Sequence, residues 1–470
     1  MGRKEDNIKR ATEVMHNRER IRNLAIAAHI DHGKTTLSDN LIAGAGMMSE
    51  ELAGKSRVLD FDDQESARGI TINAASASMV HGVDGEDYLI NLIDTPGHVD
   101  FGGDVTRAMR AVDGCIILTC AVEGAMPQTE TVVRQALKEK VRPVLFINKV
   151  DRLINELQVT PEDMMARFQK QIIKVNDLIR TFAPEQHKSD WQVDVAKGTV
   201  AFGSAYHNWG ITVPFMQKTG VNFPEIFEYC NNEQQKELAK KAPVHEVLLD
   251  MAVEKLPSPL VAQEYRIPNI WQGDLDSEVG KTMVNCDADG PLSLMITKIW
   301  MDPHAGEVAV GRVYSGTIKQ GETVWASGAG KAERVQQVSM MVGGDRIQVP
   351  GVSAGNIAAL TGVRSAAAGV TITRDKDETP FEAIRHYSEP VVTVAIEPKS
   401  MKDLPKFIGA LRSLAKSDAS LSVDTNHETG EALLSGMGEL HLEITIYRLE
   451  EEQGIKVNQS NPIVVYRESI

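Results

Sequence analysis

The 470-residue chain lacks cysteine pairs, an excess of positive charge and a long apolar run. Its four cysteines form no C-x-x-C pair, so we expect reduced thiols in a cytoplasmic protein. The formal net charge is −15, from 50 basic and 65 acidic residues, which argues against general coating of nucleic acid and against DNA as a partner. The longest apolar run, residues 115–122, is too short to span a membrane, and no membrane contact is expected.

One basic segment stands out against the acidic whole, near the start of the chain. Its positive residues are Arg3, Lys4, Lys9, Arg10, Arg18, Arg20 and Arg22. Such a patch could meet RNA locally. The acids between these residues favour a plain solvated helix and argue against an organelle transit peptide.

A phosphate-binding loop is the first motif that carries chemistry. Residues 28–36 follow an apolar strand expected over residues 23–27. In such a loop, backbone N–H groups and a helix N-terminus point at one place, which suits a polyanion. Lys34 can reach β and γ phosphates, and the Thr35 hydroxyl can ligate Mg²⁺. Ala28 replaces the first glycine of the generic motif, so further motifs are needed. The residues expected to bind nucleotide here are Ala28, His29, Ile30, Asp31, His32, Gly33, Lys34, Thr35 and Thr36.

The sequence Asp94-Thr95-Pro96-Gly97-His98 follows a second apolar segment, residues 88–93. An aspartate at the carboxyl end of a buried strand can hold Mg²⁺ through water. Gly97 leaves a bare backbone N–H free to approach a γ-phosphate. The alternative is an ordinary turn, since Thr-Pro-Gly is good turn chemistry. The order of strand, acid and glycine after the loop favours the nucleotide site.

Two further motifs predict which base is read. Asn148-Lys149-Val150-Asp151 follows an apolar segment over residues 144–147. The Asp151 carboxylate can accept hydrogen bonds from guanine N1–H and the N2 amine, which adenine does not offer, at a cost of about 1–3 kcal/mol per missing bond. Backbone N–H groups of Gly203, Ser204 and Ala205 can bond guanine O6. GTP and GDP are therefore the expected nucleotides.

Between the phosphate loop and Asp94 lies Arg68-Gly69-Ile70-Thr71-Ile72. Thr71 could coordinate Mg²⁺ only while a γ-phosphate keeps the segment ordered, as in a switch. The preceding stretch, residues 44–68, is rich in Gly, Ser, Asp and Glu, which suits a mobile segment, although composition alone would equally fit an inert surface loop. The expected metal ligands are Thr35, Thr71 and Asp94.

Together, A-H-I-D-H-G-K-T-T, R-G-I-T-I, D-T-P-G-H and N-K-V-D resemble the translational GTPases rather than small signalling GTPases, which have glutamine where this chain has His98. The resemblance implies that His98 positions the attacking water when the sarcin–ricin loop of the ribosome moves it inward. It also implies that Ile30 and Ile70 shield this water, and that Asp31 helps to hold a monovalent cation or the loop. The sequence leaves open whether His98 is also a general base. The alternative is a purely structural role, in which the ring nitrogens of His98 find their hydrogen-bond partners at the start of a helix.

No arginine is an obvious catalytic finger within the chain. Arg57 and Arg68 are candidates by position, although both suit the mobile segment better. Slow intrinsic hydrolysis that a partner accelerates is therefore expected.

The expected fold is multidomain. Residues 1–263 should form an α/β phosphate-loop GTPase domain with a basic N-terminal helix and insertions. Residues 264–380 should be a linker plus a β-barrel, because glycines punctuate short alternating segments. Residues 381–470 read as β-α-β-β-α-β, an α+β ferredoxin-like domain with split βαβ order.

The last domain favours the translocase branch of the family. An aminoacyl-tRNA carrier would have a second barrel there, and Gly-Met-Gly-Glu-Leu-His-Leu at residues 436–442 strengthens the likeness to the elongation factor 2 type of archaea and eukaryotes. That type continues into two more domains past residues 466–468, so we expect a fragment that binds GTP and fails at productive translocation.

The expected function is ribosome-dependent GTP hydrolysis in elongation, coupled to translocation of tRNA and mRNA, which the chain would meet only indirectly. A monomer that uses GTP or GDP and Mg²⁺ is expected, with a monovalent cation as a further ligand if Asp31 holds one rather than the loop. Two alternatives stay open: another translational GTPase acting in recycling, quality control or assembly, and a non-catalytic guanine-nucleotide switch.

Overall fold

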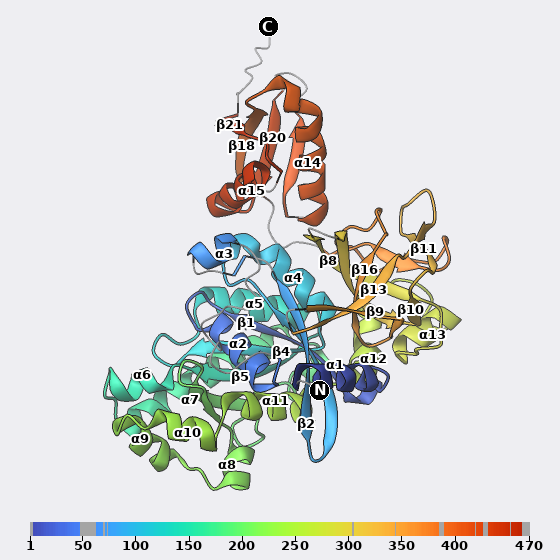
Figure 1. The fold of residues 1–470 in the computed structure, drawn as a ribbon. Coiled ribbons are helices and arrows are strands. Elements are labelled where there is room, and N and C mark those ends of the chain that lie inside the picture. The colour runs from blue at the N-terminus through green and yellow to red at the C-terminus, as the bar shows by residue number, and fades with distance from the viewer. Residues whose placement is uncertain are drawn as a thin grey trace.

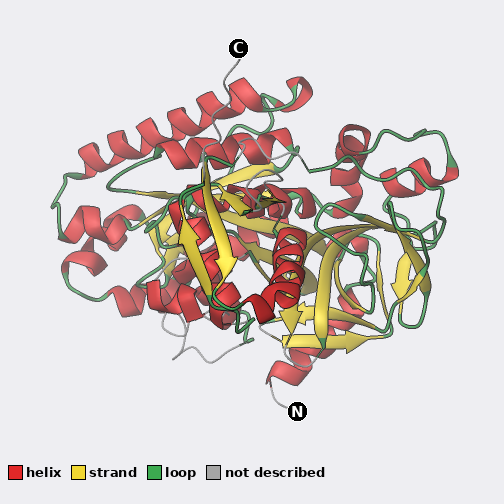
Figure 2. Ribbon diagram, turned by 90° about the horizontal axis from the view of Figure 1, so that it is seen from above, coloured by secondary structure: helices red, strands yellow, loops and turns green. Residues whose placement is uncertain are grey.

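The computed structural model describes residues 3–47, 63–68, 71–72, 74–302, 305–343, 345–384, 390–418, 420–425, 431–451 and 453–462. Figure 1 shows a large α/β domain, a β-barrel domain beside it and a small α+β domain at the C-terminal end. In the view of Figure 2, the strand-rich second domain again lies beside the helix-rich first one.

The α/β domain is built on one mainly parallel sheet. Its strand order is β2-β3-β1-β4-β5-β6-β7, in which β2 and β7 pair antiparallel with their neighbours and the others run parallel. The strands are β1 (Ile21–Ala28), β2 (Ala75–Val83), β3 (Glu86–Asp94), β4 (Gly114–Cys120), β5 (Arg142–Asn148), β6 (Val200–Ser204) and β7 (Trp209–Ile211). The near-continuous apolar strands predicted from the sequence are these central strands, which parallel sheets bury on both faces.

Helices cover both faces of this sheet. Along β1, Leu24 and Ile26 belong to one apolar core with α2 and α11, whereas Ala25 and Ala27 belong to another with α4, α5 and α7. The helices are α1 (Arg3–Val14), α2 (Lys34–Gly44), α3 (Asp63–Arg68), α4 (Gly102–Ala111), α5 (Pro127–Lys138), α6 (Val150–Asn155), α7 (Pro161–Phe182), α8 (Val213–Thr219), α9 (Phe223–Asn231), α10 (Gln235–Lys241), α11 (Val244–Lys255), α12 (Pro259–Ile270) and α13 (Glu278–Val284). Short 3-10 turns lie at η1 (Arg18–Arg20), η3 (Val99–Phe101) and η4 (Glu185–His187).

The interpretation of the basic head as a plain solvated helix is wrong in part. Ala11 on α1 is fully buried, and so is Met15 just after the helix. The Arg10 guanidinium donates to both carboxylate oxygens of Asp87, at 2.8 and 2.5 Å. This helix therefore packs on the α/β domain, because one face is apolar in spite of its many charges.

The second domain is antiparallel throughout. Its strands are β8 (Ser293–Asp302), β9 (Gly306–Ser315), β10 (Thr317–Lys319), β11 (Thr323–Ala326), β12 (Glu333–Arg334), β13 (Gln337–Val342), β14 (Asp345–Val349), β15 (Gly351–Ser353), β16 (Ile357–Thr361) and β17 (Thr371–Thr373). A single pairing of Val342 with Ser78 joins β13 to the sheet of the first domain. A buried charged group completes the connection: Asp113 is 2.9 Å from Arg266 and 2.9 Å from Arg312, with all three side chains fully buried.

The third domain has the predicted split βαβ order. Its elements are β18 (Val392–Pro398), η5 (Met401–Asp403), α14 (Leu404–Ser417), β19 (Ser422–Thr425), β20 (Ala432–Gly436), α15 (Glu439–Glu451) and β21 (Val457–Ser460). The antiparallel sheet order is β19-β20-β18-β21. Phe407 and Leu411 of α14, one helical turn apart, pack with Leu449 of α15 on the sheet.

All four cysteines are free and buried. Burial raises the pKa of the Cys115, Cys230 and Cys286 thiols to about 12. Within the described ranges, no helix is both long and apolar enough to cross a membrane.

Candidate functional site

The phosphate loop joins β1 to α2, and its backbone requires special residues. Gly33, the N-cap of α2, has φ 91°, and a Cβ there would lie 2.6 Å from Asn148 Nδ2. Asp31 also has positive φ, at 61°, which Asp tolerates better than most residues. No side chain caps α2, and its first turn carries no acid. The N–H groups at this helix start are therefore suited to an anion.

Four side chains predicted to hold phosphate and metal meet just beyond this loop. The Lys34 ammonium is buried and donates to Asp94 Oδ1 and to Thr71 Oγ1, each at 3.0 Å. The Thr35 and Thr71 hydroxyls are 3.0 Å apart. Thr71 thus meets the residues of the phosphate loop although it lies far from them in sequence. The three predicted metal ligands therefore lie together: Thr71 and Asp94 bond the Lys34 ammonium, and Thr35 is beside Thr71.

This donor set fits Mg²⁺. Magnesium prefers hydroxyl, carboxylate and water oxygens. Asp94 is fully buried, and among the described residues its Oδ2 has no hydrogen-bond partner. An unpaired buried carboxylate oxygen is costly unless a cation or donor satisfies it. The residues present therefore fit the ion that the sequence predicts.

His98 lies at the end of the Asp94 motif, next to the phosphate loop. A Cβ placed on Gly97 would lie 3.4 Å from the backbone nitrogen of Ile30, so the two loops touch here. The His98 side chain is 28% exposed. Its Nδ1 accepts a hydrogen bond from the Asp100 backbone N–H at 3.2 Å and lies 3.3 Å from Asp100 Oδ1.

Asn148 ties the base-reading motifs to the phosphate loop. Its Nδ2 donates to the His32 carbonyl at 2.8 Å, and its Oδ1 accepts from the Ala205 N–H at 2.8 Å. Lys149, in the left-handed region with φ 60°, donates from Nζ to the Asp31 carbonyl. The Asn148 side chain thus links its own motif to the phosphate loop and to the loop that contains Ala205.

Asp151 lies in the first turn of α6, with its carboxylate largely buried. Within the described part of the chain, its Oδ1 has no hydrogen-bond partner, and its Oδ2 is 3.7 Å from His207 Nε2. Gly203 lies near the end of β6, where a Cβ would overlap the Trp209 carbonyl of the neighbouring strand. Next to it, Ser204 Oγ accepts from the His207 N–H at 3.2 Å. A buried acceptor beside a glycine-bearing strand end can receive donors from a planar base.

Of the two loop histidines, His32 is buried and His29 is half-buried at the cavity. His32 is fully buried with Nε2 3.2 Å from Glu123 Oε2, and burial, followed by the neighbouring His29, lowers its pKa. The His29 and His32 rings meet edge to face with centroids 5.1 Å apart. Across the residues that the structure describes, no group of three His, Cys, Asp or Glu side chains is placed to bind a metal.

One cavity of about 330 Å³ collects most of these residues. Its lining comprises His29, Ile30, Asp31, Gly33, Lys34, Thr35, Thr36, Asp39, Thr71, Gly97, His98, Asn148, Lys149, Ala205 and Tyr206. Six of the predicted site residues do not line this cavity: Ala28, His32, Asp94, Asp151, Gly203 and Ser204. Ile70 lies outside the described residues.

Sequence reasoning missed two lining residues, Asp39 and Tyr206. Asp39 follows Thr35 by four positions on α2 and so faces the same side. Tyr206 follows Ala205 directly and is 83% exposed, which is unusual for an aromatic ring. Helical spacing and adjacency were the available signals.

Comparison with known proteins gives three family matches in the order of the three domains. The Elongation factor Tu GTP binding domain matches residues 19–258, slightly more than half of the chain. Elongation factor Tu domain 2 matches residues 306–373, and Elongation Factor G, domain III matches residues 387–461. These matches confirm the predicted fold class, an α/β domain followed by a β-barrel and an α+β domain.

Relatives named Elongation factor 2 are similar over the whole chain. Those of Picrophilus torridus, Thermoplasma acidophilum and Pyrococcus furiosus are 63%, 61% and 62% identical over 470 residues. Each comparison covers 100% of this chain and 64% of the relative. The chain thus spans less than two thirds of the length of the curated relatives that it matches.

Proposed function

This chain belongs to the family of the Elongation factor Tu GTP binding domain, and on that premise we propose that it binds and hydrolyses GTP in translation elongation, as elongation factor 2 relatives would. The observation that carries the proposal is the cavity of about 330 Å³, which the phosphate loop, the candidate metal ligands Thr35 and Thr71, and parts of both base-reading motifs line together. His98 stands at the same cavity. A guanine nucleotide in it would be held at both ends.

Phosphate binding follows from the loop and from Lys34. The N–H groups at the start of α2 and the Lys34 ammonium present positive charge to one point. Magnesium, held by Thr35, Thr71 and Asp94, would neutralise the charge of the β and γ phosphates. Because Thr71 lies outside the phosphate loop, its place beside Lys34 makes this segment sensitive to the third phosphate.

Guanine specificity follows from Asp151. Guanine offers two adjacent donors, N1–H and the N2 amine, to a single carboxylate, and adenine offers neither. The unpaired Asp151 Oδ1 gives this preference a structural basis. Lys149 would flank the same base, whereas the Ala205 N–H is already bonded to Asn148 Oδ1 and holds that loop in place.

His98 would orient the attacking water. When its Nδ1 accepts the Asp100 N–H, a neutral ring carries its proton on Nε2, which can then donate to a water oxygen. Ile30, half-buried beside it, would exclude other waters, and Asp31 would support the loop or a monovalent cation. Since no arginine of the described chain lines the cavity, we propose that the ribosome, through its sarcin–ricin loop, completes the site.

The test is phosphate release from GTP by this chain, with and without ribosomes. We expect tight binding of fluorescent GDP and GTP, slow release of phosphate alone, and a ribosome-dependent increase that His98→Ala abolishes without weakening nucleotide binding. Glu162→Gln, an exposed change on α7 far from the motif sequences, serves as the matched control. Stimulated turnover that survives His98→Ala would refute the role of His98. Absence of guanine-nucleotide binding would refute the proposed function.

A further inference from the structure

The segment that follows His98 lies against the α+β domain. Phe101, at the end of η3, packs with Ile444 of α15 and with Ile72 in a small buried apolar cluster. At the rim, the Arg68 guanidinium donates to both carboxylate oxygens of Glu443, at 2.7 and 3.2 Å. The third domain thus touches both segments that flank the γ-phosphate end of the candidate site.

Asp100 stands between a residue of the site and a residue of the third domain. It is 7% exposed. Its Oδ1 lies 3.3 Å from His98 Nδ1, and its Oδ2 accepts a hydrogen bond from the His441 backbone N–H at 3.4 Å. One carboxylate therefore contacts His98 on one side and the start of α15 on the other.

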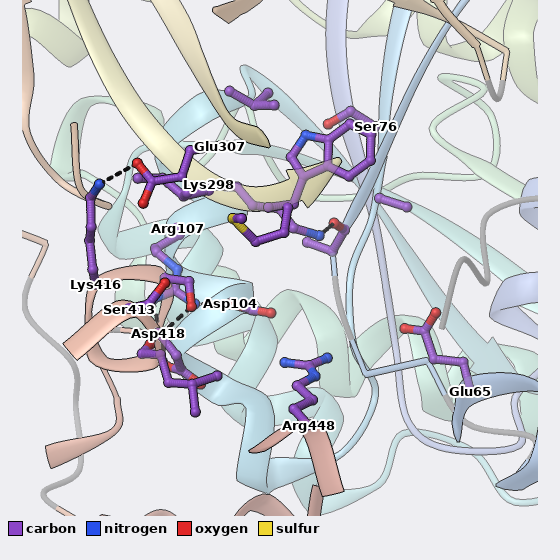
Figure 3. A pocket seen from close by; sticks show the side chains of 18 of the residues that line it. Glu65, Ser76, Asp104, Arg107, Lys298, Glu307, Ser413, Lys416, Asp418 and Arg448 are labelled. Atoms are coloured by element: carbon purple, nitrogen blue, oxygen red, sulfur yellow. Dashed lines mark hydrogen bonds and ion pairs between the residues drawn. The ribbon is translucent and has the colours of Figure 1, made fainter. Parts of the chain in front are cut away.

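His441 is itself held in one orientation. Its Nδ1 accepts from the Met437 backbone N–H at 3.1 Å, so the proton of a neutral ring is on Nε2, which is 2.8 Å from Asp418 Oδ2. Asp418 also accepts from the Ser420 N–H at 2.9 Å, and its Oδ1 is 3.8 Å from Nη1 of Arg107 on α4. Figure 3 shows Arg107 pointing toward Asp418 where the domains meet.

The approach of the two domains at Asp100 is close enough to require glycine. A Cβ on Gly438 would overlap the Asp100 carboxylate. The rings of Phe101 and His441 meet edge to face with centroids 5.9 Å apart. Any withdrawal of the α+β domain would therefore release Asp100 on the side away from His98.

We propose that Asp100 and His441 are positioning residues for His98, so that docking of the α+β domain fixes the orientation and proton placement of the His98 imidazole. This inference rests on the proposed function, in which His98 orients the attacking water. Asp100 bonds Nδ1 in either of two ways: its N–H donates to a neutral ring, or its carboxylate accepts from a protonated one. Which arrangement holds depends on where the carboxylate lies, and the backbone N–H of His441 holds its second oxygen.

The kinetic test compares single-turnover GTP hydrolysis with nucleotide affinity in the whole chain, with and without ribosomes. Asp100→Asn keeps the size of the side chain and removes its charge, so we expect the hydrolysis rate to fall about 10-fold while GTP affinity stays within about twofold, as for other groups that orient a reacting side chain. Glu443→Gln, which loses the rim contact with Arg68 but touches neither histidine, should leave the rate within about twofold. A rate within twofold of the unmodified chain in Asp100→Asn would overturn the proposal.

A second measurement needs no hydrolysis. Imidazole ¹⁵N resonances of the histidine-labelled chain, with the His98 signals assigned by His98→Gln, report where the ring proton lies. We expect these signals to shift in Gly438→Ala, whose new Cβ would press on the Asp100 carboxylate. We also expect a shift in His441→Gln, which keeps the backbone N–H but loses the ring contacts with Met437 and Asp418 that hold the start of α15. The signals should stay unchanged in Glu443→Gln. Unshifted His98 signals in both variants would refute the positioning role even if GTP hydrolysis is normal. Failure of the unmodified chain to bind GTP would instead refute the proposed function. The His98 signals would still show whether the α+β domain positions the His98 ring.

Discussion

Replacing Asp151 by Asn tests the predicted guanine specificity most directly. The Asp151 carboxylate is largely buried, and its Oδ1 has no partner among the described residues. Two hydrogen bonds from guanine to this charged group should each contribute about 1.5–3 kcal/mol. Asn keeps one acceptor oxygen but turns an NH₂ toward the N2 amine, so both bonds are weakened. We therefore expect GDP to bind at least about 100-fold more weakly, which corresponds to about 2.7 kcal/mol.

The same substitution should create affinity for a different base. Xanthine has a carbonyl oxygen where guanine has its amine, and the amide NH₂ of Asn can donate to that oxygen. Competition against fluorescent GDP, with GDP, XDP and ADP as competitors, measures all three affinities. Asp163→Asn on α7, an exposed acid, is the matched control and should change none of them. GDP affinity within about threefold of the unmodified chain, or no gain for XDP, would contradict the assignment of Asp151 to base recognition.

Three further predictions concern stability and the loop. Asp113→Ala would leave two arginines buried without their partner, so we expect a loss of about 3–5 kcal/mol in urea unfolding, and a loss below 1 kcal/mol would contradict it. Gly33→Ala should abolish nucleotide binding, measured by fluorescent GDP titration, because φ is 91° and the new Cβ would press on Asn148; retained affinity would refute this. Burial raises the pKa of Asp418, but the His441 hydrogen bond and Arg107 more than offset it, so the folded pKa lies below 3.8. Its stabilising contribution is therefore complete well above pH 3.8 and is lost as the pH falls below it; unfolding curves should show a shallower acid slope for Asp418→Asn.

Local patterns predicted the fold because each pattern depends on residues near one another in sequence. The apolar segments at residues 23–27 and 88–93 became β1 and β3, which end at the phosphate loop and at Asp94. In a parallel sheet, the carboxyl ends of neighbouring strands share one edge, so motifs after successive strands must meet there. That rule accounts for the convergence of Lys34 with Asp94.

Contacts between distant segments carried no such signal. The Asp100–His441 bond joins residues 341 positions apart. Asp100 lies two residues after the motif at residues 94–98 and His441 lies within residues 436–442, and each segment was interpreted only within its own domain. Arg266 and Arg312 would both be assigned to the surface from composition, since arginine is rarely fully buried without a partner. Their partner Asp113 follows no recognisable motif, so the buried join between the first two domains could not be predicted.

The two junctions of the α/β domain differ in a way that bears on movement. The junction with the β-barrel buries Asp113, Arg266 and Arg312 completely, and separating these domains would expose or strand all three charges. The junction with the α+β domain has a small apolar cluster, the buried Asp100–His441 hydrogen bond and the partly exposed Arg68–Glu443 pair. It borders a cavity of about 560 Å³ that Arg107 and Asp418 help to line (Figure 3). Its separation costs less, because water can satisfy the polar groups that part. The α+β domain is therefore the part of the described chain best able to shift against a rigid pair, and a shift there would reach His98 through Asp100.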